Sequence, residues 1–206
     1  MRDRRGIVLS LLVAAVAVPA SPARAQNWVH LTVNPYVGAL VFDDSELNDA
    51  GLEVNIGAMG GARVGVALGD DWQFEASYGF ARLALEASEF ETDADGEEQN
   101  FNAQLYTGNV NYLIGSDQAP TRLLLSVGAG FMALDPEVGE SETDPLASLG
   151  AGFTHPIREG ILFRGDVKDQ MLFCSAPASG SDGSVCLEDQ LLHNIEVTAG
   201  LEFVFF

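Results

Sequence analysis

The sequence predicts an all-β fold: an eight-stranded antiparallel up-and-down transmembrane β-barrel that follows an N-terminal signal peptide. Three observations predict it. Apolar and polar residues alternate along many segments, as in strands that present each face to a different environment. Long polar connections alternate with short ones, as in barrels whose two rims differ. The chain also ends on an alternating apolar strand, residues 198–206, which suits a strand that closes a barrel in lipid.

The first 25 residues have the pattern of a secretory signal peptide. Three arginines form a basic start, residues 7–18 are apolar apart from one serine, and the segment ends Ala-Arg-Ala at Ala25. Because the apolar run is shorter than the ~20 residues of a spanning helix, cleavage after Ala25 is favoured over a retained membrane anchor. We therefore expect one mature domain, the barrel at residues 26–206.

Composition restricts the function of the mature chain. Without residues 1–25 the chain has six basic and 29 acidic residues, a formal net charge of −23. Such a charge argues against nucleic-acid binding. No apolar stretch beyond the signal reaches the length of a membrane helix, so a membrane role requires strands. Two cysteines in an exported chain predict one disulfide, Cys174–Cys186, which would staple a loop rich in Ser, Gly and Ala.

Eight alternating segments reach the ~9–11 residues of a tilted membrane strand. We expect strands over residues 29–42, 52–68, 72–85, 101–114, 122–134, 146–157, 161–173 and 190–206. The long polar connections are residues 43–51, 86–100, 135–145 and 174–189, and the short ones are residues 69–71, 115–121 and 158–160. The short connections are expected to be periplasmic turns and the long ones outer loops.

The two faces of these strands indicate which side of the barrel wall faces lipid. Trp72, Phe74 and Tyr78 share one face of their strand, and Gln73 and Glu75 share the other. A water-soluble barrel would be apolar inside, so we place the apolar face toward lipid and the polar, glycine-rich face in the lumen. The lumen glycines should relieve crowding in a small barrel. The aromatic residues expected at the membrane interfaces are Trp72, Tyr78, Tyr112 and Phe203 to Phe206.

The last strand also carries a C-terminal motif. Thr198 is followed by Gly200 and then by Phe203, Phe205 and Phe206. Three other segments match known barrel strands: residues 34–40, 128–131 and 150–153. On these residues the chain resembles the small eight-stranded bacterial outer-membrane barrels of the outer-membrane protein A and X type. In that family the C-terminal motif is an assembly signal.

The resemblance covers residues 27–206 and implies an integral protein of the bacterial outer membrane. It implies insertion by the barrel-assembly machinery and contact with outer-membrane lipid and lipopolysaccharide. We expect a monomer without a cofactor or a metal site, and the resemblance carries no active site over to this chain.

Charged residues with inward parity are the first candidate site. They are Arg63, Glu75, Arg164, Asp166, Lys168, Glu196 and Glu202. Because the interior of an eight-stranded barrel is just wide enough for side chains, buried charges there must pair or keep water. A tight turn at residues 69–71 would place Arg63 diagonally opposite Glu75. We expect a salt-bridged plug, with a gated narrow pore or a catalytic site as alternatives.

The histidines are the second candidate. His30, His155 and His193 are scattered, and none has a Ser and an acid at a spacing typical of a nucleophile. Lipid A deacylase barrels carry a His-x-Ser pair, which neither His155 nor His193 matches. A lipid-modifying enzyme therefore remains an alternative without support from the sequence.

The outer loops are the third candidate. The four long connections hold 19 of the 29 mature acidic residues and no Lys or Arg. Clustered carboxylates attract Ca²⁺ or Mg²⁺, but residues 93–97 match only part of a calcium loop, so no specific metal site is predicted. We expect a hydrated, self-repelling surface suited to high salt, with bridging by divalent cations to lipopolysaccharide phosphates as the alternative.

These observations favour a non-enzymatic outer-membrane barrel with a structural, surface-barrier or interaction role carried by its acidic outer loops. A narrow pore for ions or small solutes is the first alternative, and a lipid-modifying barrel enzyme is the second.

Overall fold

The computed structural model describes residues 29–42, 52–54, 56–87, 99–115, 120–136, 141–174 and 191–205. These residues form nine strands of one sheet: β1 (Val29–Val41), β2 (Leu52–Val54), β3 (Gly57–Leu68), β4 (Trp72–Ala87), β5 (Gln99–Ile114), β6 (Arg122–Pro136), β7 (Glu142–Arg158), β8 (Ile161–Phe173) and β9 (Leu191–Phe205). None of the described segments is a helix long and apolar enough to cross a membrane.

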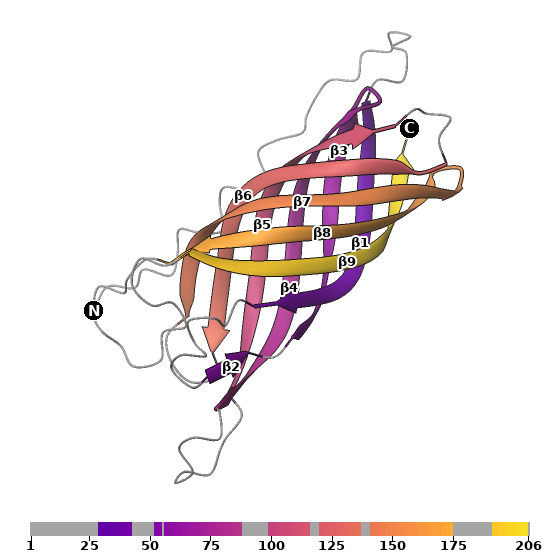
Figure 1. The fold of residues 1–206 in the computed structure, drawn as a ribbon. Helices are drawn as coiled ribbons and strands as arrows, with labels where there is room; N and C mark the ends of the chain where they lie inside the picture. The colour runs from indigo at the N-terminus through magenta and orange to yellow at the C-terminus, as the bar shows by residue number, and fades with distance from the viewer. Residues whose placement is uncertain are drawn as a thin grey trace, which may run out of the picture.

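The sheet closes into a barrel of eight long antiparallel strands, which confirms the predicted fold class. β1 pairs with β3 on one side and with β9 on the other, and the pairing of β4 with β5 completes the circuit. Figure 1 shows β9, in yellow, beside β8 and curving toward the indigo β1. The short β2 pairs with β4 beyond the part of β4 that pairs with β3. The register changes by one residue between the pairs Val54–Leu85 and Ala58–Arg82.

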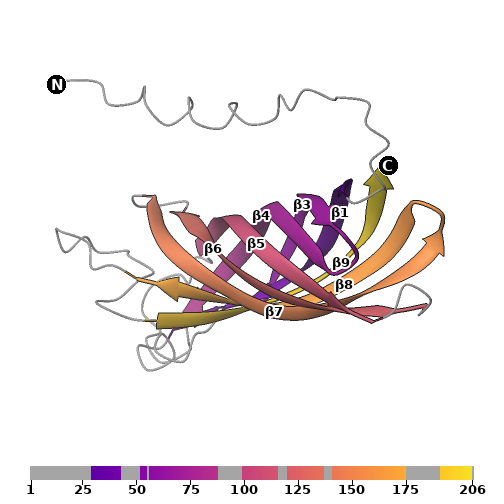
Figure 2. The same cartoon turned by 90° about the horizontal axis from the view of Figure 1, so that it is seen from above.

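The strands cross the barrel obliquely (Figure 2). A row of paired residues that leaves β8 at Met171 runs once around the barrel and returns to β8 at Ile161, a stagger of 171 − 161 = 10 residues. A barrel of eight strands with this stagger has strands tilted by roughly 40° and an interior that side chains fill. Residues on different strands therefore meet in the lumen although they are far apart in sequence.

The observed strand bounds correct two predicted segments. Part of the expected loop at residues 135–145 is strand, because β6 reaches Pro136 and β7 begins at Glu142, with Leu134 paired to Glu142. The ladder continues there because outward polar side chains meet water on a strand that extends past the membrane. The expected strand 52–68 is interrupted between Val54 and Gly57.

The outer wall is apolar between two aromatic levels. At the end with the short turns, Trp72 and Tyr112 lie with ring centroids 4.9 Å apart. Toward the end with the long connections, Tyr78 and Tyr106 lie with ring centroids 5.1 Å apart. Between them, exposed side chains such as Val127 cover the wall. This is the apolar band that a barrel presents to lipid.

The inner wall is polar for only part of its length, which corrects the expectation of a uniformly polar lumen. Along β4 the inward residues change from Gln73 and Glu75 to Ala81 and Leu83, while the outward residue Arg82 is exposed. β5 and β6 change in the same way. The buried apolar side chains at the long-connection end, here called the apolar layer, include Leu40, Met59, Leu83, Leu105, Met132, Leu134, Leu146, Leu172 and Leu192. The inward residues are apolar at this end because it projects beyond the aromatic level, where water and not lipid surrounds the outer wall.

Several predictions lie outside the described residues. They are the signal peptide at residues 1–25, Cys186, Phe206 and most of the acidic outer connections, including residues 93–97.

Candidate functional site in the barrel lumen

The structure brings the seven predicted lumen charges together. Each is at most 5% exposed, and they come from β3, β4, β8 and β9. The group contains three cations and four carboxylates, a formal excess of one negative charge. Half of the six Lys and Arg residues that follow residue 25 are thus inside the barrel. We call these seven side chains the ion network.

Arg164 is the centre of the ion network. Its guanidinium donates to Glu75 at 2.6 Å, to Glu202 at 3.0 Å and to Asp166 at 3.0 Å. The side chain has no measurable exposure. A buried guanidinium is stable only when such partners compensate its lost hydration, so the three carboxylates and Arg164 hold one another in place.

Arg63 joins the network from the neighbouring side. Its Nη1 donates to Asp166 and its Nη2 to Glu196, both at 2.9 Å. Its Nε lies 3.9 Å from Glu75, across the tight turn, in the diagonal relation expected from residues 69–71. The guanidinium also stacks 4.0 Å above the ring of Tyr36. Lys168 completes the set, with its Nζ 3.7 Å from Glu75.

Neutral polar residues extend the network, and they are not among the seven charged residues predicted for the lumen. Gln73 donates to Glu202 at 3.3 Å and accepts from Asn111 at 3.1 Å. Gln170 donates to Glu196 at 2.7 Å, and Asn34 accepts from Arg63 at 2.9 Å. All of them have inward parity, so parity combined with hydrogen-bonding capacity would have identified them.

Glycines provide the space for these long side chains. A Cβ on Gly61 would lie 2.6 Å from the Tyr36 hydroxyl, and one on Gly79 would lie 2.7 Å from it. A Cβ on Gly150 would meet Lys168 at 2.6 Å. A larger residue would displace Tyr36 at the first two positions and Lys168 at the third, and at Gly61 it would also collide with the Tyr78 carbonyl oxygen, so these positions require glycine for reasons of packing.

The ion network and the apolar layer fill the lumen in sequence along its axis. On β8, the inward residues pass from Arg164 and Lys168 to Gln170 and then to Leu172. A solute that entered the lumen would have to separate charge pairs and then cross apolar side chains. This arrangement is suited to sealing a barrel.

The other predicted site residues are not gathered into one site. His193 lies on the outer wall of β9 with its Nδ1 2.8 Å from Asp169 of β8. His155 lies at the opposite rim, 2.9 Å from the Thr121 hydroxyl. Cys174 follows β8 and is buried, and its predicted disulfide to Cys186 stays a prediction. Within the described ranges, no group of three or more His, Cys, Asp or Glu side chains is placed to hold a metal ion.

The C-terminal motif forms the seam of the barrel. Phe203 and Phe205 of β9 pair with Val33 and Leu31 of β1, while Thr198 and Gly200 face the lumen on the same strand. Phe205 is 52% exposed on the outer wall.

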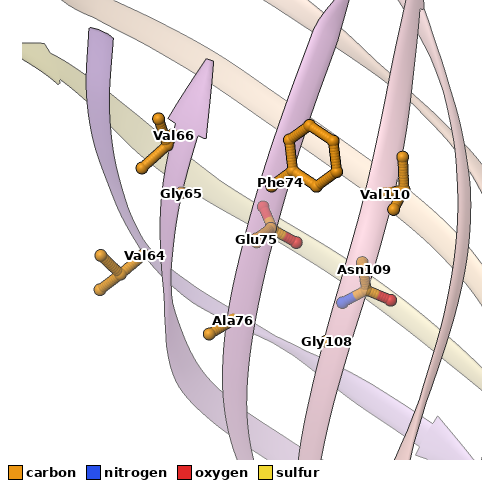
Figure 3. A pocket seen from close by; sticks show the side chains of 9 residues that line it. All are labelled: Val64, Gly65, Val66, Phe74, Glu75, Ala76, Gly108, Asn109 and Val110. Carbon is orange, nitrogen blue, oxygen red and sulfur yellow. The ribbon is translucent and has the colours of Figure 1, made fainter. Parts of the chain in front are cut away.

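A shallow groove crosses the outer wall between β3 and β5. It is lined by apolar side chains, with Val64 and Val66 on one side and Phe74 and Val110 on the other, and Gly108 forms part of its floor. Figure 3 shows these residues with Glu75 and Asn109, which alternate with them along their strands. The groove faces the apolar band, where lipid chains cover the wall.

Comparison with known proteins gives one family and one fold. The family model described as "Outer membrane protein beta-barrel domain" matches residues 9–203. No curated protein sequence matches the chain. Similar solved structures are OprG of Pseudomonas aeruginosa, with 10% identity, TM-score 0.60 and coverage of 86% of this chain and 96% of that one, and neisserial surface protein A, with 9%, 0.59, 86% and 97%. A major outer membrane protein from Thermus thermophilus has 15% identity, TM-score 0.56 and coverage of 86% and 99%.

Proposed function

The chain belongs to the family of outer membrane protein beta-barrel domains. Within this family, we propose that it is a barrel with a closed lumen that functions through its outer rim. The protein is an integral barrel of the bacterial outer membrane. Its proposed role is non-enzymatic: structural, surface-barrier or interaction, carried by the acidic outer loops.

The filled lumen is the observation that carries this proposal. Arg164 and Arg63 are at most 1% exposed, and Met132 and Leu172 of the apolar layer have no measurable exposure. Conduction would require the protein to break charge pairs in a medium of low dielectric constant and to wet an apolar constriction, and both are unfavourable. A role outside the lumen fits these contents better.

The composition of the long connections suggests what the rim binds. They hold 19 of the 29 mature acidic residues and no basic residue. Carboxylates bind Ca²⁺ and Mg²⁺ through oxygen ligands, and the same ions bind phosphates. We therefore propose that divalent cations bridge the loops to lipopolysaccharide phosphates and so strengthen the surface barrier.

A charge-neutral loop tests the rim proposal. The variant replaces the six acidic residues between residues 88 and 98 by their amides, and its control permutes the same residues without changing the charge. Binding of lipopolysaccharide to the protein in phospholipid nanodiscs is measured with and without Ca²⁺. We expect Ca²⁺-dependent binding by the natural and permuted proteins and a loss of several-fold in the neutral one. Equal binding by all three would contradict the proposal.

A narrow pore is the second candidate, and the polarity of the lumen within the apolar band favours it. The excess negative charge of the ion network would select cations. Planar-bilayer recordings separate the two functions. The sealed-barrel proposal expects no discrete openings, whereas openings that vanish when Arg164 and Glu202 are neutralised would favour the pore.

A lipid-modifying enzyme is the third candidate, and the contact between His193 and Asp169 favours it. The pair lies on the outer wall, and a carboxylate that orients an imidazole is a common part of acid–base sites. The chain lacks a His-x-Ser pair at this position, since Asn194 and Ile195 follow His193. Mass spectra of lipid A from cells with and without the protein decide the matter, and an unchanged spectrum excludes lipid A modification.

A further inference from the structure

Arg82 differs from the other basic residues in place and in partners. Of the six Lys and Arg residues that follow residue 25, three belong to the ion network, and Arg122 and Arg158 lie at the short-turn end of β6 and β7. Arg82 is the sixth, and it is exposed at the long-connection end of β4. Among the described residues no carboxylate forms an ion pair with Arg82, whereas Arg122 and the ion network are paired. Its guanidinium is therefore available to an anion from outside the chain.

Two neutral amides lie beside Arg82 on the outer wall. Its partner on β5 is Asn102, and Gln104 lies two positions away on the same face of that strand. The Tyr106 hydroxyl donates to Gln104 Oε1 at 3.0 Å, which leaves the amide nitrogen of Gln104 to donate. The next residue of that row, Asp135 of β6, is two strands from Arg82 and accepts a hydrogen bond from a serine hydroxyl at 2.6 Å. We call Arg82, Asn102 and Gln104 the donor cluster, and a guanidinium with neighbouring amides is suited to a phosphate.

The depth of Arg82 corresponds to the outer surface of the membrane. Trp72 belongs to the aromatic level at the short-turn end, and it lies 82 − 72 = 10 positions from Arg82 on β4. At about 3.3 Å per residue and a tilt of roughly 40°, this separation spans about 25 Å along the barrel axis. The apolar band of such barrels is about 25 Å tall, so Arg82 lies at the depth of the outer-leaflet headgroups.

The apolar groove between β3 and β5 lies on the same wall (Figure 3). Ala76, which lines it, is 82 − 76 = 6 positions from Arg82, or about 15 Å along the axis toward the short-turn end. Half of the hydrocarbon core is also about 15 Å thick, so an acyl chain whose headgroup lies at Arg82 reaches the groove. The outward residues of β3 between the two places are the small Gly60 and Ala62, which leave this path open.

We propose that this wall binds the lipid A part of one lipopolysaccharide molecule, with a phosphate on the donor cluster and an acyl chain in the groove. A phosphate monoester carries a charge of about −1.5 to −2 at pH 7, and a guanidinium binds it through paired hydrogen bonds. The groove favours a lipid over free phosphate, because it continues from the donor cluster into the apolar band. The site uses a cation of the protein itself, so it needs no Ca²⁺ or Mg²⁺ and does not rest on the proposed role of the acidic loops.

Binding of diphosphorylated lipid A to the purified barrel tests the proposal. It is measured by native mass spectrometry in a non-ionic detergent with EDTA, which removes any contribution of divalent cations at the loops. Arg82→Gln removes the cation, and Arg158→Gln, at an exposed position of the short-turn end, is the control with the same change of charge. We expect Arg82→Gln to weaken binding about tenfold, the factor that corresponds to one charge-assisted hydrogen bond, and Arg158→Gln to leave it unchanged. Equal binding by the two variants would overturn the proposal. Binding that the natural protein loses in EDTA would also overturn it, and would support the loops instead.

Two leucine substitutions test the groove. Gly108→Leu fills it without a collision, because a Cβ at this position would meet its nearest heavy atom at 4.0 Å. Ala151→Leu fills a second apolar groove, over β7 to β9 on the other side of the barrel, and is the matched control. We expect only Gly108→Leu to weaken lipid A binding, by several-fold. Equal binding by the two leucine variants would overturn the placement of the acyl chain. Heat-modifiable gel mobility, compared with that of the natural protein, confirms that each variant is folded.

Discussion

Replacing Arg164 by Met tests the ion network most directly. Met keeps much of the volume of the side chain but removes the cation that bonds to Glu75, Asp166 and Glu202. Removing one partner of a buried ion pair costs about 3–5 kcal/mol, because the remaining charge is left without compensation. Here three carboxylates lose their shared partner, so the loss in free energy of unfolding is expected to reach at least the upper part of that range.

The assay is reversible urea unfolding in phospholipid vesicles at neutral pH, followed by tryptophan fluorescence and heat-modifiable mobility. Arg82→Met is the matched control. Arg82 is exposed on the outer wall, and a surface substitution of this kind changes stability by about 0.5 kcal/mol or less. A loss below about 1 kcal/mol for Arg164→Met would refute the argument that the carboxylates depend on this guanidinium.

A second substitution tests whether Arg164 and Glu75 are energetically coupled. Adding Glu75→Gln to Arg164→Met removes one of the orphaned charges, so the double variant should be more stable than Arg164→Met alone. In the natural background, Glu75→Gln should be destabilising, because it leaves Arg164 and Lys168 with fewer partners. If Glu75→Gln destabilises both backgrounds equally, the two residues are not coupled.

Three further predictions concern the packing, the disulfide and the seam. Gly61→Ala should destabilise the barrel by about 1–3 kcal/mol, since its Cβ would collide with the backbone carbonyl oxygen of Tyr78 and lie 2.6 Å from the Tyr36 hydroxyl, whereas Gly108→Ala, whose nearest neighbour would be 4.0 Å away, should be tolerated in the same urea assay. Reduction of the predicted Cys174–Cys186 bond should lower stability by about 3 kcal/mol, measured as the shift in urea midpoint, and an unchanged midpoint with two titratable thiols would exclude it. Phe205→Ser should lower recovery in outer-membrane fractions and raise the unassembled fraction, while equal recovery would show that the terminal aromatic is dispensable for assembly.

The sequence predicts the barrel well because side chains alternate between the two faces of a strand, so a period of two residues shows which residues share a face. The strand at residues 161–173 was predicted with its observed bounds, and the inward parity of Arg63, Arg164 and Glu202 follows from the same alternation. The pairing of Arg63 with Asp166, at 103 positions' separation, requires the register of several strands and cannot be read from any one of them.

The apolar layer was missed for a related reason. Along β4, Ala81 and Leu83 have the same parity as Glu75, but the alternation alone does not indicate where the membrane ends. A Leu next to Arg82 fits the alternation whichever of the two side chains faces the lumen. Only the positions of the aromatic rings show that this part of β4 lies outside the lipid. Likewise, the sequence predicts a loop at Asp144 because the segment around it is acidic. In the structure Asp144 is a buried residue of β7.

The contact between β1 and β9 determines the order of events when the protein is made. Leu31 pairs with Phe205, so the seam joins residues 205 − 31 = 174 positions apart, and it forms only after the last strand has been synthesised and exported. Such a distant contact closes slowly. Until then the growing sheet has two unpaired edges that invite association with other chains. Because β1 has no other partner on that side, any truncation that removes β9 leaves an open sheet with two exposed edges instead of a smaller barrel.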